Sequence, residues 1–218
     1  FILAFLIVGI PLAGLCWLVL KANPKNKVNQ SFAWLCSACI FWLAALFYSD
    51  YLVNSSSTVW DSITMVGGNI IAIALIVFTR RLTLHAVFPK PVLVLILILM
   101  FVDSILLFLI PNFAGVRVTG ESTYQFIGGP GYYVHIILNF STFIYSLYFL
   151  RKKALFSQNK QMIEKYRLIV HGGVVGVTIN LFAEIFFVLF KTERLQYSVF
   201  YDMVCAVGIL YFACTSAY

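Results

Sequence analysis

Charged residues are scarce in this chain. Only 11% of its 218 residues are Asp, Glu, Lys or Arg, while 62% are hydrophobic. A soluble domain of ordinary composition carries about 25% charged residues. The polar surface is therefore too small to cover a globule in water, which excludes a soluble fold and favours a protein whose surface faces lipid.

Catalytic and metal-binding motifs are also missing. The chain contains neither H-E-x-x-H nor G-x-S-x-G, and it has no glycine-rich phosphate loop followed by Lys. Its five cysteines all fall in apolar stretches, and Cys36-x-x-Cys39 has no second pair and no nearby histidine to complete a metal site. We therefore expect no active site, no metal and no cofactor within this chain.

The chain does contain seven apolar stretches of membrane-spanning length. They cover Phe1–Leu20, Ser31–Leu52, Trp60–Phe78, Pro91–Ile110, Tyr132–Leu150, Leu168–Phe190 and Val199–Tyr218. A helix crosses the hydrocarbon core with about 20 residues, and the runs are continuous, unlike the alternating strands of a barrel. The sequence predicts an all-α, multi-pass protein of the plasma membrane, with seven transmembrane helices in a single domain over residues 1–218.

The positions of the basic residues predict the orientation of this bundle. Twelve of the 15 Lys and Arg residues lie in the loops after the first, third and fifth stretches. The other three, Arg117, Lys191 and Arg194, lie in loops of opposite parity. Because basic loops stay in the cytoplasm, we expect the N-terminus outside and the C-terminus in the cytoplasm. The net charge of +7 then reflects topology and contact with anionic membrane lipids, and no nucleic-acid partner is expected.

Two loops are longer than the others. Residues 111–131 contain short alternating runs between glycines, which predict a small hairpin that serves either as a lid or as an ordinary connector. Residues 151–167 are basic and partly helical in pattern. This second loop is expected to extend the fifth and sixth helices into the cytoplasm.

Small residues in two helices predict close helix packing. Gly172 and Gly176 form a G-x-x-x-G spacing, which lets helix backbones approach closely inside the bundle or at a dimer face. Gly67 and Gly68 are candidates for the same role in the third helix. His171, near the cytoplasmic end of the sixth stretch, is expected to cap that helix or to reach toward the interface.

Polar residues inside the apolar stretches mark the candidate site, since ionisable groups in a membrane are costly and usually face the bundle interior. Besides Asp61 at the outer mouth of the third helix, six of them fall in the outer half by depth and are the site candidates, namely Asp103, His135, Asn139, Asn180, Glu184 and Asp202. We expect them to line one outward-facing cavity, with Glu184 paired to His135. The acids favour a cationic or hydrogen-bond-donating ligand, an unidentified small molecule or lipid. Two alternatives stay open: hydrogen bonding that only pins helices together, and a proton or ion path.

The first basic loop carries a recognisable string, Asn23-Pro24-Lys25-Asn26-Lys27-Val28-Asn29-Gln30-Ser31-Phe32, with Trp42 ten residues further on. It resembles the loop of the N-terminal seven-helix region of bacterial sensor histidine kinases. Phe88-Pro89, Gly129-Pro-Gly131-Tyr132 and the glycine-rich sixth stretch are similar as well. Locally, Pro24 ends the first helix, and Asn29 or Ser31 is expected to cap the second.

This resemblance implies a function in two-component signalling. The chain would receive a signal in the membrane and relay it to a cytoplasmic kinase or another output domain after Tyr218, within a homodimer of the full-length protein. The alternative is a small-molecule or ion transporter, or a channel, that uses the same cavity. A G-protein-coupled receptor fits less well, because Phe78-Thr79-Arg80-Arg81 lacks that class's acidic-Arg-aromatic motif and the last stretch has no Asn-Pro-x-x-Tyr.

Overall fold

The computed structural model describes residues 2–51, 59–110, 112–119, 124–190 and 207–217. Within these ranges, side chains are described except at 2–5, 49–51, 116–119, 124–127, 180–181 and 183–190. The elements are α1 (Ile2–Ala22), α2 (Lys27–Tyr51), α3 (Val59–Thr83), α4 (Lys90–Leu109), β1 (Gly115–Thr119), β2 (Tyr124–Gly128), α5 (Pro130–Phe156) and α6 (Lys160–Phe190). A further helix, Val207–Ala217, follows.

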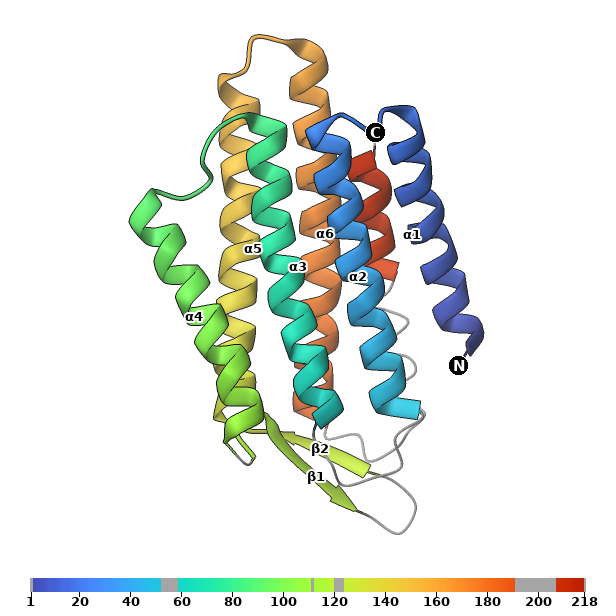
Figure 1. Cartoon of the computed structure of the whole chain (residues 1–218), viewed down its shortest axis with the longest axis vertical. Coiled ribbons are helices and arrows are strands. Elements are labelled where there is room, and N and C mark those ends of the chain that lie inside the picture. The colour runs from blue at the N-terminus through green and yellow to red at the C-terminus, as the bar shows by residue number, and fades with distance from the viewer. Residues whose placement is uncertain (1, 52–58, 111, 120–123, 191–206, 218) are drawn as a thin grey trace.

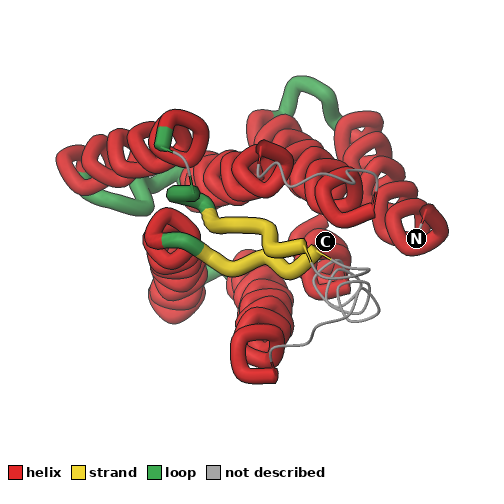
Figure 2. The backbone as a smooth tube through the Cα atoms, turned by 90° about the horizontal axis from the view of Figure 1, so that it is seen from below, coloured by secondary structure: helices red, strands yellow, loops and turns green. Residues whose placement is uncertain are grey.

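The helices stand side by side as one upright bundle (Figure 1). The α1–α2, α3–α4 and α5–α6 connections gather at one end, and the β1–β2 hairpin lies at the other. Seen from the hairpin end, the two strands cross beneath the helices (Figure 2). The strands pair antiparallel from Gly115 opposite Gly128 to Thr119 opposite Tyr124. The hairpin predicted for residues 111–131 is therefore present, and it is the one departure from an all-α fold in the described chain.

Helix boundaries confirm most of the predicted stretches. Four described helices, α2 to α5, are long and apolar enough to cross a membrane, and Leu6–Ala22 and Val207–Ala217 form shorter apolar helices. α5 continues to Phe156 and α6 begins at Lys160, which confirms the predicted helical extensions of the 151–167 loop. The predicted start of the last helix, at Val199, lies outside the described residues.

Helix α3 lies at the centre of the bundle, since it packs against α2, α4 and α5. Its inward side chains Phe78 and Leu75 are fully buried in the largest apolar cluster. Helix α4 is peripheral, and its Val94, Ile98 and Phe101 side chains are all more than half exposed. An apolar face of this size suits contact with lipid acyl chains rather than with water.

The Asn-Pro loop closes two helix ends with side-chain amides. Asn26 Oδ1 accepts a hydrogen bond of 2.8 Å from the backbone N–H of Val28, so Asn26 is the residue that caps α2. Asn29 Nδ2 donates to the carbonyl oxygens of Val19 at 2.9 Å and Asn23 at 3.3 Å. The prediction that Asn29 or Ser31 caps α2 was wrong, because the helix begins four residues earlier than the apolar stretch. Asn29 instead satisfies carbonyls at the end of α1.

Glycines let α6 approach the helices on either side of it. A Cβ atom at Gly173 would overlap the Leu147 side chain of α5. A Cβ atom at Gly172 would overlap Thr215 of the last helix, and one at Gly176 would lie 2.9 Å from the carbonyl oxygen of Gly208. The predicted role of the G-x-x-x-G spacing in packing inside the bundle is confirmed.

Replacement of Gly176 by Ala should therefore destabilise the bundle. The nearest obstacle is a backbone carbonyl, which cannot rotate away as a side chain would, so we expect a loss of about 1–3 kcal/mol from overpacking. Thermal unfolding of the purified full-length protein in detergent measures this loss. Gly14→Ala is the matched control, because nothing lies within 4 Å of its added Cβ. Equal unfolding temperatures for the two variants would contradict this packing.

Candidate functional site

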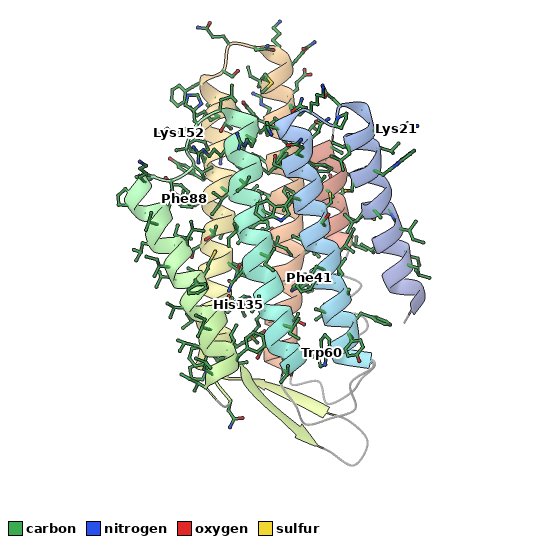
Figure 3. The ribbon with its side chains drawn as sticks, viewed as in Figure 1. Lys21, Phe41, Trp60, Phe88, His135 and Lys152 are labelled. Carbon is green, nitrogen blue, oxygen red and sulfur yellow. The ribbon has the colours of Figure 1, made fainter. Side chains whose placement is uncertain are left out.

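A buried hydrogen-bonded network joins α3, α4 and α5. Its members are Asn69 of α3, Asp103 and Ser104 of α4, and His135 and Asn139 of α5. Figure 3 shows His135 in the half of the bundle nearer the hairpin, away from Lys21 and Lys152. Asn69, Asp103 and His135 are each less than 9% exposed, so the network lies within the bundle rather than on its surface.

The position of Asp103 follows from the way α4 packs. The buried residues of this helix are Met100, Asp103 and Leu107, spaced three and four apart, so they form one narrow inward stripe. Leu107 is further tied to α3, because Ser62 Oγ donates to its carbonyl oxygen at 2.9 Å. The carboxylate is therefore held on the one side of α4 that faces α3 and α5.

His135 meets this carboxylate from α5. Its Nδ1 lies 3.1 Å from Asp103 Oδ2, within hydrogen-bond distance. The other ring nitrogen, Nε2, lies against α3, and a Cβ atom at Gly68 would be only 2.9 Å from it. The imidazole therefore fits in this position because residue 68 is glycine, and any larger side chain there would clash with it.

Asn69 fixes the orientation of the rest of the network. Its Nδ2 lies 3.1 Å from Asp103 Oδ2 and 3.3 Å from the carbonyl oxygen of Met100, and both of these atoms accept hydrogen bonds. Its Oδ1 must then accept, and it does so from Asn139 Nδ2 at 2.9 Å. Asn139 Nδ2 also donates to the backbone carbonyl oxygen of His135 at 3.0 Å, so the amide orientations are set by acceptors that cannot donate.

Two acceptor atoms in this network have no hydrogen-bond donor. Asp103 Oδ1 and Asn139 Oδ1 are both buried, and neither has a hydrogen-bond partner. Buried polar atoms are usually paired, and an unpaired one costs about 1–3 kcal/mol. By contrast, Thr142 and Ser146 of α5 bond carbonyl oxygens of their own helix and need no further partner. The network therefore has spare capacity to accept hydrogen bonds.

The electrostatics of the site follow from where the charges of these three helices lie. Their Lys and Arg residues are at the end opposite the hairpin, at Arg80 and Arg81 of α3, Lys90 of α4, and 151–153 of α5. In the described part of these helices, the histidine is the one group that can place a positive charge against the Asp103 carboxylate. No described residues form a group of three or more His, Cys, Asp or Glu side chains placed to hold a metal ion.

Three of the six predicted site residues come together, and two further residues join them. Asp103, His135 and Asn139 are in direct contact. The side chains of Asn180, Glu184 and Asp202 lie outside the described residues. The partner predicted for His135 was Glu184, whereas the described partner of its Nδ1 is Asp103. Asn69 and Ser104 were not predicted for the site. The sequence does contain a signal for Asn69, because it is an amide side chain in the middle of an apolar stretch, directly after Gly67-Gly68.

Of the two roles predicted for His171, capping of the sixth helix was wrong, and reaching toward the membrane interface stays a prediction. Because α6 begins at Lys160, His171 lies three turns into the helix and does not cap it. Its exposed ring meets the last helix, where Tyr211 Oη lies 3.2 Å from Nδ1. This pair links α6 to the last helix and is separate from the buried network.

Comparison with known protein families identifies the family to which this helical bundle belongs. A family model described as the N-terminal 7TM region of histidine kinase matches residues 1–218. The chain belongs to this family. No curated protein and no solved structure matches it. The described residues contain seven helical segments, four of them long and apolar, which fits the family's description, and the predicted resemblance to this family is confirmed.

Replacement of Asn69 by Leu should weaken the link between α3, α4 and α5. The change removes the amide that bonds Asp103, Met100 and Asn139, and we expect a loss of about 1–3 kcal/mol in unfolding free energy. Thr64→Val on the same helix is the control, since Thr64 Oγ1 bonds the Trp60 carbonyl oxygen of its own helix. A Thr64→Val loss as large as that of Asn69→Leu would show that the network adds nothing.

Proposed function

We propose that this chain is the sensory membrane domain of a two-component histidine kinase. Its N-terminus is outside, its C-terminus is in the cytoplasm, and it detects an extracellular or membrane-borne signal in an outward-facing polar cavity. Family membership over residues 1–218 supports the sensor role. The single observation that supports the site is the buried network of Asp103, His135 and Asn69, which joins α3, α4 and α5.

The charge distribution supports the proposed orientation. The α1–α2, α3–α4 and α5–α6 connections lie at one end of the bundle, and with the adjoining helix ends they carry 12 of the 15 basic residues of the chain. Basic loops are retained in the cytoplasm. The network lies in the opposite half (Figure 3), which this orientation makes the outer half.

A continuous set of contacts is available to relay a change in the network to the last helix. The network includes α5, which packs on α6 through Leu147 and Gly173. α6 in turn contacts the last helix at Gly172 with Thr215 and at Gly176 with Gly208. Close glycine contacts leave little slack, so a shift of α5 displaces its neighbours. The output domain expected after Tyr218 would receive this movement.

A transporter or channel is the alternative, since a polar network between helices can also serve an ion path. Two measurements on the full-length protein separate these functions. A sensor kinase carries a phosphoacceptor helix pair and an ATP-binding domain after Tyr218, labels itself with phosphate from ATP, and moves no solute across proteoliposomes. A full-length protein that transports solute and does not bind ATP would overturn the proposal.

The proposed topology predicts the sides on which two loops are reached. Cysteines introduced at Ser56 and Gln158 should react with a membrane-impermeant maleimide from opposite sides of the membrane, Ser56 from outside and Gln158 from the cytoplasm. The unsubstituted protein serves as the blank, because its five cysteines all lie in apolar stretches. Labelling of both positions from the same side would contradict the orientation.

A further inference from the structure

The end of α5 presents two large apolar side chains on the surface of the bundle. Leu155 and Phe156 are 70% and 76% exposed, and each follows a basic residue, Arg151 or Lys152, by four positions. Residues four apart lie on the same face of a helix. These four residues therefore form one exposed patch, which we name the tip surface. Ala154, between them in the sequence, points inward and is buried in the main apolar cluster.

The tip surface lies beyond the membrane. Phe88, two residues before α4 begins at Lys90, stacks on Tyr145 of α5 with ring centroids 4.5 Å apart. Tyr145 therefore marks the level at which α4 begins. Phe156 is eleven residues further along α5, or about 16 Å, whereas the headgroup layer adds only about 5–8 Å on each side of the hydrocarbon core. Figure 1 shows the α5–α6 connection extending past the other connections at that end.

The turn between α5 and α6 holds the tip surface in a fixed shape. Asn159 Oδ1 caps α6 by accepting hydrogen bonds from the backbone N–H groups of Gln161 at 3.0 Å and Met162 at 3.3 Å. Ser157 Oγ accepts one from the N–H of Asn159 at 3.3 Å. A surface that is ordered before it binds loses less conformational entropy on binding. Since apolar patches exposed to water mark interaction sites, the tip surface has the properties of a docking site for a protein.

The charge around the tip surface favours an acidic partner. Residues 151–167 contain six basic residues and one acidic residue, Glu164. A second copy of this surface would bring the same positive charge, and like charges placed against each other oppose association. Anionic lipid headgroups match the charge, but they lie nearer the membrane than Phe156 does. A protein surface that combines Asp or Glu with apolar side chains matches both parts of the patch.

The last helix ends beside the α5–α6 hairpin. Its Ala217 packs against the apolar cluster that contains Ala154 and Tyr166. α6 begins at Lys160, six residues before Tyr166, which is about 9 Å along the helix. The output domain expected after Tyr218 would therefore begin close to the tip surface. We propose, resting on the sensor role above, that the tip surface docks on an acidic surface with apolar residues in the cytoplasmic output domain of the same polypeptide.

This contact gives the buried network a second route to the output domain. α5 is one continuous helix from Pro130 to Phe156, so it carries His135 of the network and the tip surface on the same rigid element. A shift of α5 at the network moves the tip surface without passing through α6 and the last helix. The output domain is then held at two points, its own connection to the last helix and the tip surface.

A photo-reactive benzoylphenylalanine introduced at position 156 of the full-length protein, in native membranes, tests this contact. Mass spectrometry of the products should show adducts that join position 156 to a segment after Tyr218 that is rich in Asp and Glu. The same probe at Ile144 is the matched control. Ile144 is 53% exposed on the apolar part of α5, and the probe there should give no adduct with that segment.

Two variants make the result specific. Leu155→Ser, beside the probe, should lower the adduct yield by about tenfold, since burial of one leucine changes an equilibrium by at least about that factor. Leu84→Ser should leave the yield unchanged, although Leu84 is 86% exposed at the same end of the bundle, because it lies in the α3–α4 connection. The yield should also fall as the salt concentration rises from about 0.1 to about 1 M, since salt screens attraction between exposed charges.

The products at position 156 decide between the occupants. Adducts only with lipid would assign the tip surface to the membrane, and adducts with residues 1–218 of a second copy would assign it to a dimer. Either result, adducts with another protein, or no adduct at all would overturn the docking. Autophosphorylation of the same membranes separates this outcome from the proposed function. An active kinase without the adduct keeps the sensor role, whereas the adduct in a protein that does not bind ATP keeps the docking and overturns the kinase.

Discussion

The arrangement of the bundle depends on one constraint, the burial of an aspartate on a helix that otherwise faces lipid. Asp103 occupies the single inward stripe of α4 together with Met100 and Leu107. A carboxylate at that depth needs hydrogen-bond donors. They come from Asn69 of α3 and His135 of α5. The hydrogen bonds to this one carboxylate therefore link α3, α4 and α5.

Glycine supplies the space that these polar contacts require. Gly68 makes room for the imidazole on one face of α3, while Gly67, one residue earlier, brings the backbone of α3 against Trp42 of α2. Because helices in lipid gain little from the hydrophobic effect between them, close packing and polar contacts decide how they associate. The two glycines therefore place α3 between its neighbours, and the side-chain amide of Asn69 follows directly after them in the sequence.

Length and charge were sufficient to predict the helices, but not the partners of their polar side chains. Continuous apolar runs and basic loops are visible in a single sequence, and the predicted hairpin and the helical extensions around Ser157 were also correct. A helix that is apolar all round gives no periodicity by which to tell its lipid face from its buried face. For that reason a common depth could be predicted for Asp103 and His135 but not their direct contact, and Asn69 was not included in the predicted site. The start of α2 was missed because Lys27 and Asn29 are polar, although they lie within the helix.

The central claim is that Asp103 and His135 are coupled through a direct contact that holds α4 to α5. A double-mutant cycle measures that coupling, with Asp103→Asn, His135→Phe and the double variant compared by unfolding free energy of the full-length protein in detergent. Residues in contact show an interaction energy of about 0.5–3 kcal/mol, whereas independent sites add to within about 0.5 kcal/mol. The structure predicts that the double variant loses clearly less than the sum of the two single losses. Additive losses would contradict the contact and, with it, the role of the network as the link between these helices.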